Sequence, residues 1–164
     1  MQIRKSKYED EAAIMKVFAK AREYMFANGN KTQWVGGYPG KELLNDDILR
    51  QYSYVFESNG KIIGTFTLII GEEPTYRKIK NGVWHSDKPY GTIHRLASDG
   101  TVKGVAKACF NFCANNIDYL RIDTHRDNIT MQAAIQKFGF KKCGTIFLND
   151  GSERIAYDYI KSTV

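Results

Sequence analysis

The sequence contains little cysteine, and its cysteines do not form the pattern of a disulfide framework or a metal site. Three cysteines occur among 164 residues, and an odd number argues against full disulfide pairing. Cys109 and Cys113 fall on one predicted helix with no histidine or further cysteine at metal-site spacing. We therefore expect reduced cysteines that serve mainly in packing, and no bound metal.

Long apolar runs are also missing. No stretch approaches the roughly 20 apolar residues that a membrane-spanning helix needs, and residues 1–10 are too charged for the apolar region of a signal peptide. These absences argue against a membrane protein and predict a cytoplasmic one.

Blocks of basic residues are absent as well, although the chain carries a net charge of +6 and has a pI near 9.2. Its lysines and arginines are scattered, and no nucleic-acid-binding motif is evident. Nucleic acid is therefore disfavoured as a partner, whereas a small anionic ligand is compatible with the excess of positive charge.

The composition fits one globular domain over residues 1–164, with 43% hydrophobic and 26% charged residues. Periodicity and turn residues predict about seven strands and four helices, in the order β-α-α-β-β-β-α-β-α-β-β. The predicted strands cover 1–4, 52–57, 61–70, 91–97, 119–124, 143–148 and 153–160, and the helices cover 9–25, 41–50, a segment starting near 101–104, and 128–138.

One stretch, Gly91 to Lys107, predicts a strand, a turn of small residues and the opening of a helix. The first turn of a helix has unpaired backbone N–H groups and the positive end of the helix dipole, and this combination attracts anions. Gly104 and Ala106 would let a phosphate approach the backbone, and Lys103 and Lys107 add positive charge. The stretch therefore predicts an anion-binding cradle.

A second strand and helix follow the cradle. The strand over 119–124 leads into Asn128 to Phe140, a helical segment that Gly139 ends. Because a helix connects this strand to the cradle strand, we expect the two strands to be parallel. The connection over 71–90 is long for a compact domain, which suggests a functional role for it.

Together these segments resemble the acyl-CoA-binding core of the GNAT superfamily of N-acyltransferases. Its pattern is Q/R-x-x-G-x-G/A, followed by an Asn-led helix that ends in Gly-Phe. Residues 101–106 match the pattern in Gly104 and Ala106, with a threonine in place of Gln or Arg, and Asn128 and Lys137 fall at the family's spacing. The resemblance implies an α/β GNAT-like fold with a mixed central sheet.

The resemblance also implies acetyl-CoA as co-substrate. The N–H groups from Val102 to Ala106 would bind its pyrophosphate, the backbone of Leu96 and Ala97 would pair with its pantetheine arm, and Asn128 would cap its helix and contact that arm. The full implied set is Leu96, Ala97, Ser98, Val102, Lys103, Gly104, Val105, Ala106, Lys107 and Asn128.

The implied reaction is acetyl transfer to a primary amine, which must first lose a proton. An alkylammonium has a pKa near 10, so about one molecule in a thousand is free base at neutral pH. The strand over 91–97 contains no carboxylate. His94 is therefore our first candidate for the base, and His125 is the second. Ile135 occupies the position at which many family members carry a catalytic tyrosine.

The acceptor amine, of a small molecule or a peptide, is expected to meet aromatic residues on loops. Trp34, Tyr38, Tyr76 and Trp84 are candidates for its binding site, although packing onto the core is the alternative role for such rings. A second hypothesis stays open, in which the chain is a catalytically silent acyl-CoA-binding domain. The sequence is also compatible with a homodimer.

Overall fold

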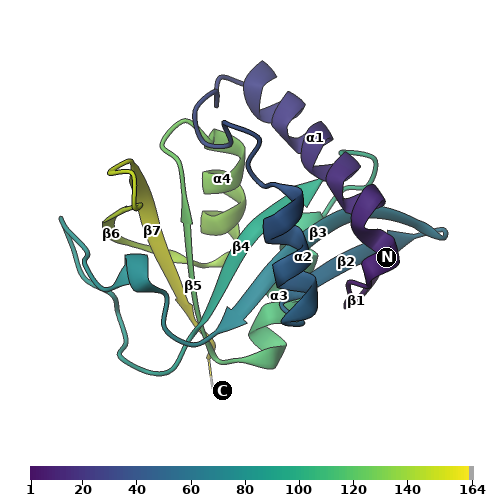
Figure 1. Cartoon of the computed structure of the whole chain (residues 1–164). Coiled ribbons are helices and arrows are strands. Elements are labelled where there is room, and N and C mark those ends of the chain that lie inside the picture. Colours follow the sequence, from purple (N-terminus) through teal and green to yellow (C-terminus); the bar gives the residue numbers. More distant parts are fainter. Residues whose placement is uncertain (163–164) are drawn as a thin grey trace. The chain divides into compact units, whose positions relative to one another are not determined.

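The computed structural model describes residues 1–162 and confirms the predicted order of elements (Figure 1). The elements are β1 (Gln2–Lys5), α1 (Glu11–Ala27), α2 (Lys41–Leu49), β2 (Ser53–Ser58), β3 (Lys61–Ile70), β4 (Gly91–Ser98), α3 (Val105–Asn116), β5 (Tyr119–Thr124), α4 (Ile129–Phe138), β6 (Lys141–Phe147) and β7 (Glu153–Ile160). Short 3-10 turns at Tyr8–Asp10 and Pro74–Tyr76 complete the set.

The strands form a seven-stranded mixed sheet in the order β1-β2-β3-β4-β5-β7-β6. β4 and β5 pair in parallel, with Gly91 opposite Leu120 and Thr92 opposite Arg121, as their helical connection predicted. Antiparallel pairing joins β1 to β2, β2 to β3, β5 to β7 and β6 to β7. The predicted α/β fold class with a mixed central sheet is therefore confirmed.

The chain divides into two compact units, and the first comprises Met1–Leu68 and His94–Val105. In this unit α1 and α2 lie over β2 and β3 (Figure 1). The apolar stripe of α1, with Ile14, Val17 and Phe18, packs with Leu44 of α2 and Val55 of β2 in one buried cluster. This burial explains the helical spacing of the apolar residues in 9–25.

The second unit comprises Ile69–Ile93 and the chain from Ala106 onward. Its C-terminal strands form a hairpin whose turn has Gly151 at a φ of 84°. One aromatic cluster joins Phe110 of α3, Phe138 and Phe140 at the end of α4, and Tyr159 of β7, with ring centroids 5.0–5.9 Å apart. Aromatic contacts of this kind stabilise the unit beyond the area they bury.

The long connection between β3 and β4 is fastened to β6. Lys80 and Thr145 exchange backbone hydrogen bonds of 2.9 and 2.8 Å. Gly82 passes so close to β6 that a Cβ there would lie 1.7 Å from the carbonyl oxygen of Cys143. Only glycine fits at this crossing, so the connection is a packed part of the second unit.

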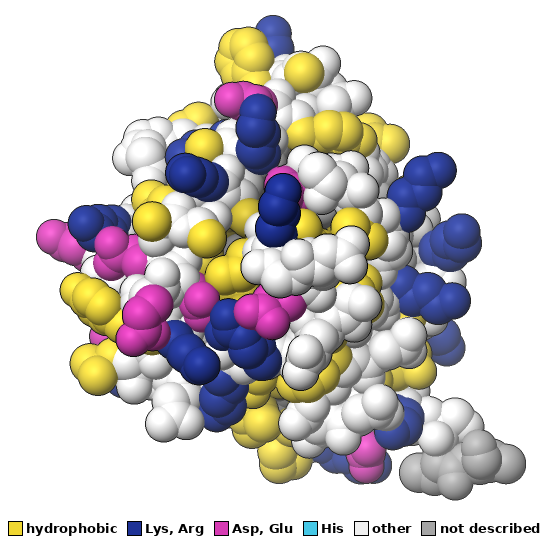
Figure 2. All heavy atoms as spheres, turned by 90° about the vertical axis from the view of Figure 1, so that its right-hand side faces the viewer, with side chains coloured by type: hydrophobic (Ala, Val, Ile, Leu, Met, Phe, Trp, Pro, Cys, Tyr) yellow, Lys and Arg dark blue, Asp and Glu magenta, His cyan; other side chains and the backbone are white. Residues whose placement is uncertain are grey.

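Charges of both signs are interspersed on the face drawn in Figure 2, where lysines and arginines lie at several separate places among acidic and apolar side chains. Among residues 1–162 no helix is both long and apolar enough to cross a bilayer.

Candidate active site

The turn between β4 and α3 is built from its own side chains. The Asp99 carboxylate accepts hydrogen bonds from the N–H and the hydroxyl of Thr101, at 2.9 and 2.6 Å, and the Ser98 hydroxyl accepts one from the Gly100 N–H at 3.1 Å. Such local bonds hold a loop in one conformation without help from the core.

Gly104 ends this turn immediately before α3. Its φ is 84°, in the left-handed region that favours glycine, and a Cβ added there would meet nothing within 4 Å. Glycine also has no side chain with which to cap the helix. Gly104 therefore does not cap the first N–H groups of α3, and the space beside Gly104 is open. The helix starts at Val105, just after the predicted window, because the left-handed Gly104 is not helical.

β4 contains an unusual backbone conformation next to the candidate base. Arg95 follows His94 and has a φ of 53°, a value that is uncommon for residues other than glycine and costs about 1–3 kcal/mol. A left-handed residue inside a strand is typical of a bulge, which leaves a residue out of the ladder and changes the direction of neighbouring side chains. We infer such a bulge at Arg95, between His94 and Leu96, two predicted site residues.

A buried ion pair holds the bulge. The Arg95 guanidinium donates to both carboxylate oxygens of Asp47 on α2, at 2.9 Å each, and the hydroxyl of Thr67 on β3 donates to the same carboxylate at 3.1 Å. The side chains of Arg95 and Asp47 are 10% and 5% exposed. Arg95 also donates to the Tyr38 hydroxyl at 3.4 Å, which ties the aromatic loop to β4.

The end of β5 carries the second candidate base. His125 Nδ1 accepts a hydrogen bond from the Asp127 N–H at 3.0 Å, which assigns the proton of the neutral imidazole to Nε2. Burial lowers the pKa of His125, and the positive charges of Arg154 and Arg126 lower it further, while Asp127 opposes them. His125 is therefore held mainly neutral near pH 7.

Asn128 begins α4 as predicted. Its side-chain oxygen accepts a hydrogen bond from the Met131 N–H at 3.0 Å, which is the bond of an N-cap. The side chain of Gln132 donates to the carbonyls of His125 and Arg126, so the segment from β5 to α4 is closely bonded to itself. The helix ends at Gly139, again as predicted, and the structure shows Gly139 in a left-handed conformation.

A pocket of about 330 Å³ opens beside His125. We call it the Arg154 pocket, and it is lined by His125, Arg126, Thr145, Gly151, Ser152, Glu153, Arg154 and Ile155. All of these residues belong to the second unit. The pocket is rich in positive charge, because its lining residues include two arginines and one glutamate.

The aromatic candidates of the second unit are packed inside it. Tyr76 is 2% exposed, and its hydroxyl donates to Asp123 at 2.6 Å. Burial raises the pKa of Tyr76 well above its usual value, and Asp123 raises it further. The Trp84 ring is tilted by 42° against the Tyr76 ring, with centroids 4.9 Å apart, and the Arg121 guanidinium lies 4.1 Å from the Trp84 ring centroid. Packing is thus the role that these contacts display, and substrate contact stays a prediction.

The aromatic candidates of the first unit lie on the loop after α1. Trp34 is half-buried and packs edge-on against Phe18 of α1, with centroids 5.7 Å apart. Tyr38 contacts Trp34 edge-on at 6.1 Å and is 39% exposed. Tyr38 therefore offers an accessible ring beside the Arg95 guanidinium, and its binding role stays a prediction as well.

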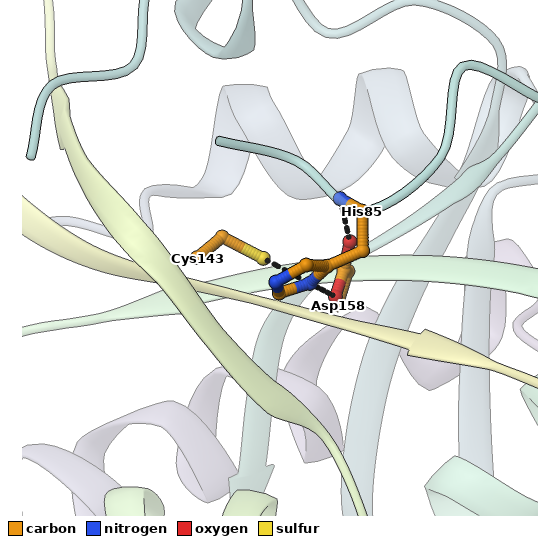
Figure 3. A group of neighbouring side chains, drawn as sticks. All are labelled: His85, Cys143 and Asp158. Atoms are coloured by element: carbon orange, nitrogen blue, oxygen red, sulfur yellow. Dashed lines mark hydrogen bonds and ion pairs between the residues drawn. The ribbon is translucent and has the colours of Figure 1, made fainter. Parts of the chain in front are cut away.

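One mixed group of side chains in the described part of the chain could hold a metal ion (Figure 3). His85 of the long connection directs Nδ1 to Asp158 Oδ1 of β7 at 2.7 Å and to Cys143 Sγ of β6 at 3.4 Å. Asp158 also accepts bonds from the His85 N–H and the Tyr119 hydroxyl, at 2.8 Å each. Hydrogen bonds account for this geometry, which fastens the long connection to the sheet.

The two units divide the predicted site residues between them. The first unit holds Trp34, Tyr38, His94, Leu96, Ala97, Ser98, Val102, Lys103, Gly104 and Val105, and the second holds Tyr76, Trp84, Ala106, Lys107, His125 and Asn128. Within the first unit, His94 and the cradle turn are joined by β4. Within the second, His125 and Asn128 are joined by a short bonded segment. Ile135, at the family's tyrosine position, is fully buried and apolar.

Sequence reasoning did not single out Asp47, Arg95, Asp158 or Arg154, which the structure places in buried polar contacts or pockets. For two of them a signal existed. Strand side chains alternate between faces, so Arg154, Ala156 and Asp158 share one face of β7, and that face is buried. A charged residue at a buried strand position indicates a specific partner or a ligand.

No protein-family model matches the sequence, and no curated protein matches it. Solved structures do match. An acetyltransferase of the GNAT family from Streptococcus agalactiae is 32% identical, with 99% of this chain and 96% of that chain covered and a TM-score of 0.89. A putative acetyltransferase from Staphylococcus aureus is 27% identical, with 98% and 99% covered and a TM-score of 0.72. A ribosomal-protein-alanine N-acetyltransferase from Brucella melitensis, at 16% identity and a TM-score of 0.61, shares the fold.

The mixed sheet, the open helix start after β4 and these likenesses define the class of the molecule as an acyltransferase. The chain belongs to the GNAT family of acetyltransferases, which confirms the resemblance found in the sequence.

Proposed function

We propose that the protein transfers an acetyl group from acetyl-CoA to a primary amine of a small molecule or a peptide. The observation that carries this proposal is the glycine turn before α3, in a chain of the GNAT family. The proposal treats the two compact units as parts of one acetyltransferase domain.

The turn fits the pyrophosphate of acetyl-CoA. Gly104 is left-handed and borders open space, so a phosphate oxygen can approach the first N–H groups of α3. Lys103 and Lys107 are exposed beside it. Bound acetyl-CoA supplies the activated acetyl group, and the backbone at Leu96 and Ala97, after the Arg95 bulge, is proposed to hold its arm.

His94 is proposed to take the proton from the acceptor amine, directly or through a water molecule. The bulge at Arg95 and its buried bond to Asp47 fix the strand beside His94. His125 is the weaker candidate, because its Nδ1 already accepts the Asp127 N–H and its neutral form then carries a proton on Nε2. The Nε2 of such an imidazole donates a hydrogen bond and does not accept a proton.

The described residues offer no tyrosine at the family position, because Ile135 is apolar and fully buried. Proton donation is worth about 10²–10⁴-fold, whereas alignment of two reactants is worth about 7–11 kcal/mol. Absence of the tyrosine as a proton donor therefore lowers the rate, but the larger contribution, which comes from alignment of the reactants, remains. A thiolate can also leave without prior protonation.

Release of free thiol from acetyl-CoA in the presence of a panel of small amines and peptides tests the proposal. We expect amine-dependent release and an acetylated product by mass spectrometry. Binding of acetyl-CoA without transfer to any amine would support the silent acyl-CoA-binding domain instead.

Gly104→Glu tests the cradle. Its side chain would place a negative charge where the pyrophosphate is proposed to bind, so we expect acetyl-CoA affinity to fall by about 100-fold or more. Gly29→Glu is a matched control, because Gly29 has a φ of 85° and also borders open space. Both variants carry the same backbone strain, and equal affinities in the two would refute the cradle.

His94→Gln tests the base. We expect normal acetyl-CoA binding, a loss of about 10²-fold in turnover and loss of the near-neutral limb of the pH profile. His125→Gln, measured on the same amine, serves as the comparison. If the His125 variant alone loses turnover and the pH limb, the base must be reassigned to His125.

A further inference from the structure

The Arg154 pocket contains a charge that the proposed chemistry does not use. Arg154 is only 6% exposed on β7, and its one hydrogen bond runs from Nη1 to the Glu153 carbonyl at 2.8 Å. A guanidinium has five N–H donors. None of the ion pairs described for residues 1–162 joins Arg154 to a carboxylate.

Burial of an unpaired charge is costly, and buried arginines are normally paired with an anion. The acidic groups near Arg154 are engaged elsewhere or exposed. Asp150 is bonded to the N–H and hydroxyl of Ser152, at 2.9 and 2.6 Å, and Asp127 lies 3.6 Å from His125 Nδ1. Glu153 lines the pocket, but its side chain is exposed. The bonds from Ser152 lower the pKa of Asp150, and the charge of Arg154 lowers it further. No described carboxylate, however, lies in ion-pair contact with the Arg154 guanidinium.

The rest of the pocket suits an anion. Arg126 supplies a second guanidinium, and Thr145 and Ser152 add hydroxyl-bearing side chains. A volume of about 330 Å³ accommodates a carboxylate or a phosphate together with a short carbon chain. A guanidinium binds both groups well, because its planar fork can donate two parallel hydrogen bonds.

The pocket lies at the carboxyl end of β5, where His125 and the Asn128 cap connect the strand to α4. Ligands of parallel strands bind at this end. An occupant would thus sit beside the segment for which we propose contact with the cofactor arm. A small acceptor that reaches both places needs an amine at one end and an anion at the other.

We propose that the Arg154 pocket binds a carboxylate or phosphate group of the acceptor, so that the preferred substrates are amines that carry an anionic group. This inference rests on the proposed acetyl transfer. The pocket itself can be tested without catalysis, and the two ideas can therefore fail separately.

The binding arm uses the full chain and two simple anions. Inorganic phosphate and acetate are titrated separately, and binding is followed by NMR of the His125 ring and by calorimetry. We expect one of them to bind wild type at millimolar concentrations and to bind Arg154→Met at least 10-fold more weakly. Lys141→Met is the matched control, because it removes one exposed charge of the same unit and should bind like wild type.

The activity arm compares two pairs of amines. Phosphoethanolamine is paired with ethanolamine, and β-alanine with its amide, so that each pair differs in the anionic group. We expect wild type to favour the anionic member of one pair by about 10-fold in kcat/KM, and Arg154→Met to abolish that preference. Because the ratio is compared between variants on the same amines, differences in amine pKa cancel.

Three outcomes would overturn the inference: neither anion binds wild type at tens of millimolar, Arg154→Met binds as wild type does, or the amine preference survives that substitution. If Arg154→Met does not fold, Arg154→Lys replaces it, since it keeps the charge but loses the fork and should weaken binding about 10-fold. Anion binding without transfer to any amine would instead contradict the proposed acetyl transfer, while anion binding by the pocket would still be supported.

Discussion

Two buried arginines, one in each compact unit, have opposite kinds of partner. Arg95 on β4 has a full carboxylate partner in Asp47, which accepts from two of its nitrogens and from Thr67. Arg154 on β7 is as deeply buried, yet its hydrogen bond goes to the carbonyl of its own neighbour. The first is satisfied by the fold, and the second is satisfied only in part.

The difference separates a structural charge from one that we propose binds a ligand. Removing one partner of a buried ion pair leaves the other charge uncompensated, which costs about 3–5 kcal/mol. Removing a buried charge that has no partner leaves nothing uncompensated, and the fold should tolerate the change. The same substitution at the two positions therefore has opposite expected effects.

Arg95→Met should have the largest effect. It leaves the Asp47 carboxylate buried without its cation, so the free energy of unfolding should fall by about 3–5 kcal/mol in urea titrations. Asp47→Asn should recover part of this loss when it is added to Arg95→Met, because an amide carries no charge. A loss below about 1 kcal/mol for Arg95→Met would show that the pair does not hold the bulge.

Asn128→Ala should have an intermediate effect. Asn128 is a buried polar side chain with a known bond, the N-cap to Met131, and its loss should cost about 1 kcal/mol of unfolding free energy. If Asn128 also contacts the cofactor arm, acetyl-CoA affinity should fall as well. Asn128→Ser keeps a cap and separates the two roles. A loss of stability alone would limit Asn128 to capping.

A smaller effect is expected in the titration of His125. Its pKa is lowered by burial and then by the charges of Arg154 and Arg126. The folded state thus disfavours the charged imidazole, so the stability that His125 contributes is complete above its unfolded pKa, about 6.5, and decreases as pH falls through that value. NMR titration should show a pKa below 6.5 in wild type and a higher one in Arg154→Met. An unchanged pKa would place Arg154 too far away to act on the pocket.

Arg154→Met should have the smallest effect on folding. Without a carboxylate partner to expose, the substitution should change the unfolding free energy by less than about 1 kcal/mol in either direction. The measurement is the same urea titration used for Arg95→Met. A loss of unfolding free energy similar to that of Arg95→Met would contradict the difference between the two arginines and make Arg154 a structural residue.

Much of the fold followed from local patterns. The order of strands and helices, the Asn128 cap and the end of α4 at Gly139 were predicted because each depends on residues that are neighbours in the chain. The glycine turn before α3 was predicted for the same reason, since Gly104 and the following helix are adjacent, and anion binding by this turn stays a prediction. The start of α3 differed slightly, because the conformation of Gly104 decides it.

The buried charges were not predicted, because their partners are distant in sequence. Arg95 and Asp47 are 48 residues apart, and His85 and Asp158 are 73 apart. No periodicity carries information about which side chains meet across such distances. Strand alternation could have placed Arg154 on the buried face of β7, but it could not have shown that no carboxylate meets it there.

The sequence by itself determined the family, the order of the elements and the glycine turn before α3, because these depend on local conformational preference and on hydrophobic periodicity. Only the tertiary structure decided which charges are paired, which aromatic rings are packed inside and where the Arg154 pocket opens. The physical reason is that pairing and burial arise when distant segments meet, and a buried charge is stable or ligand-seeking according to what it meets.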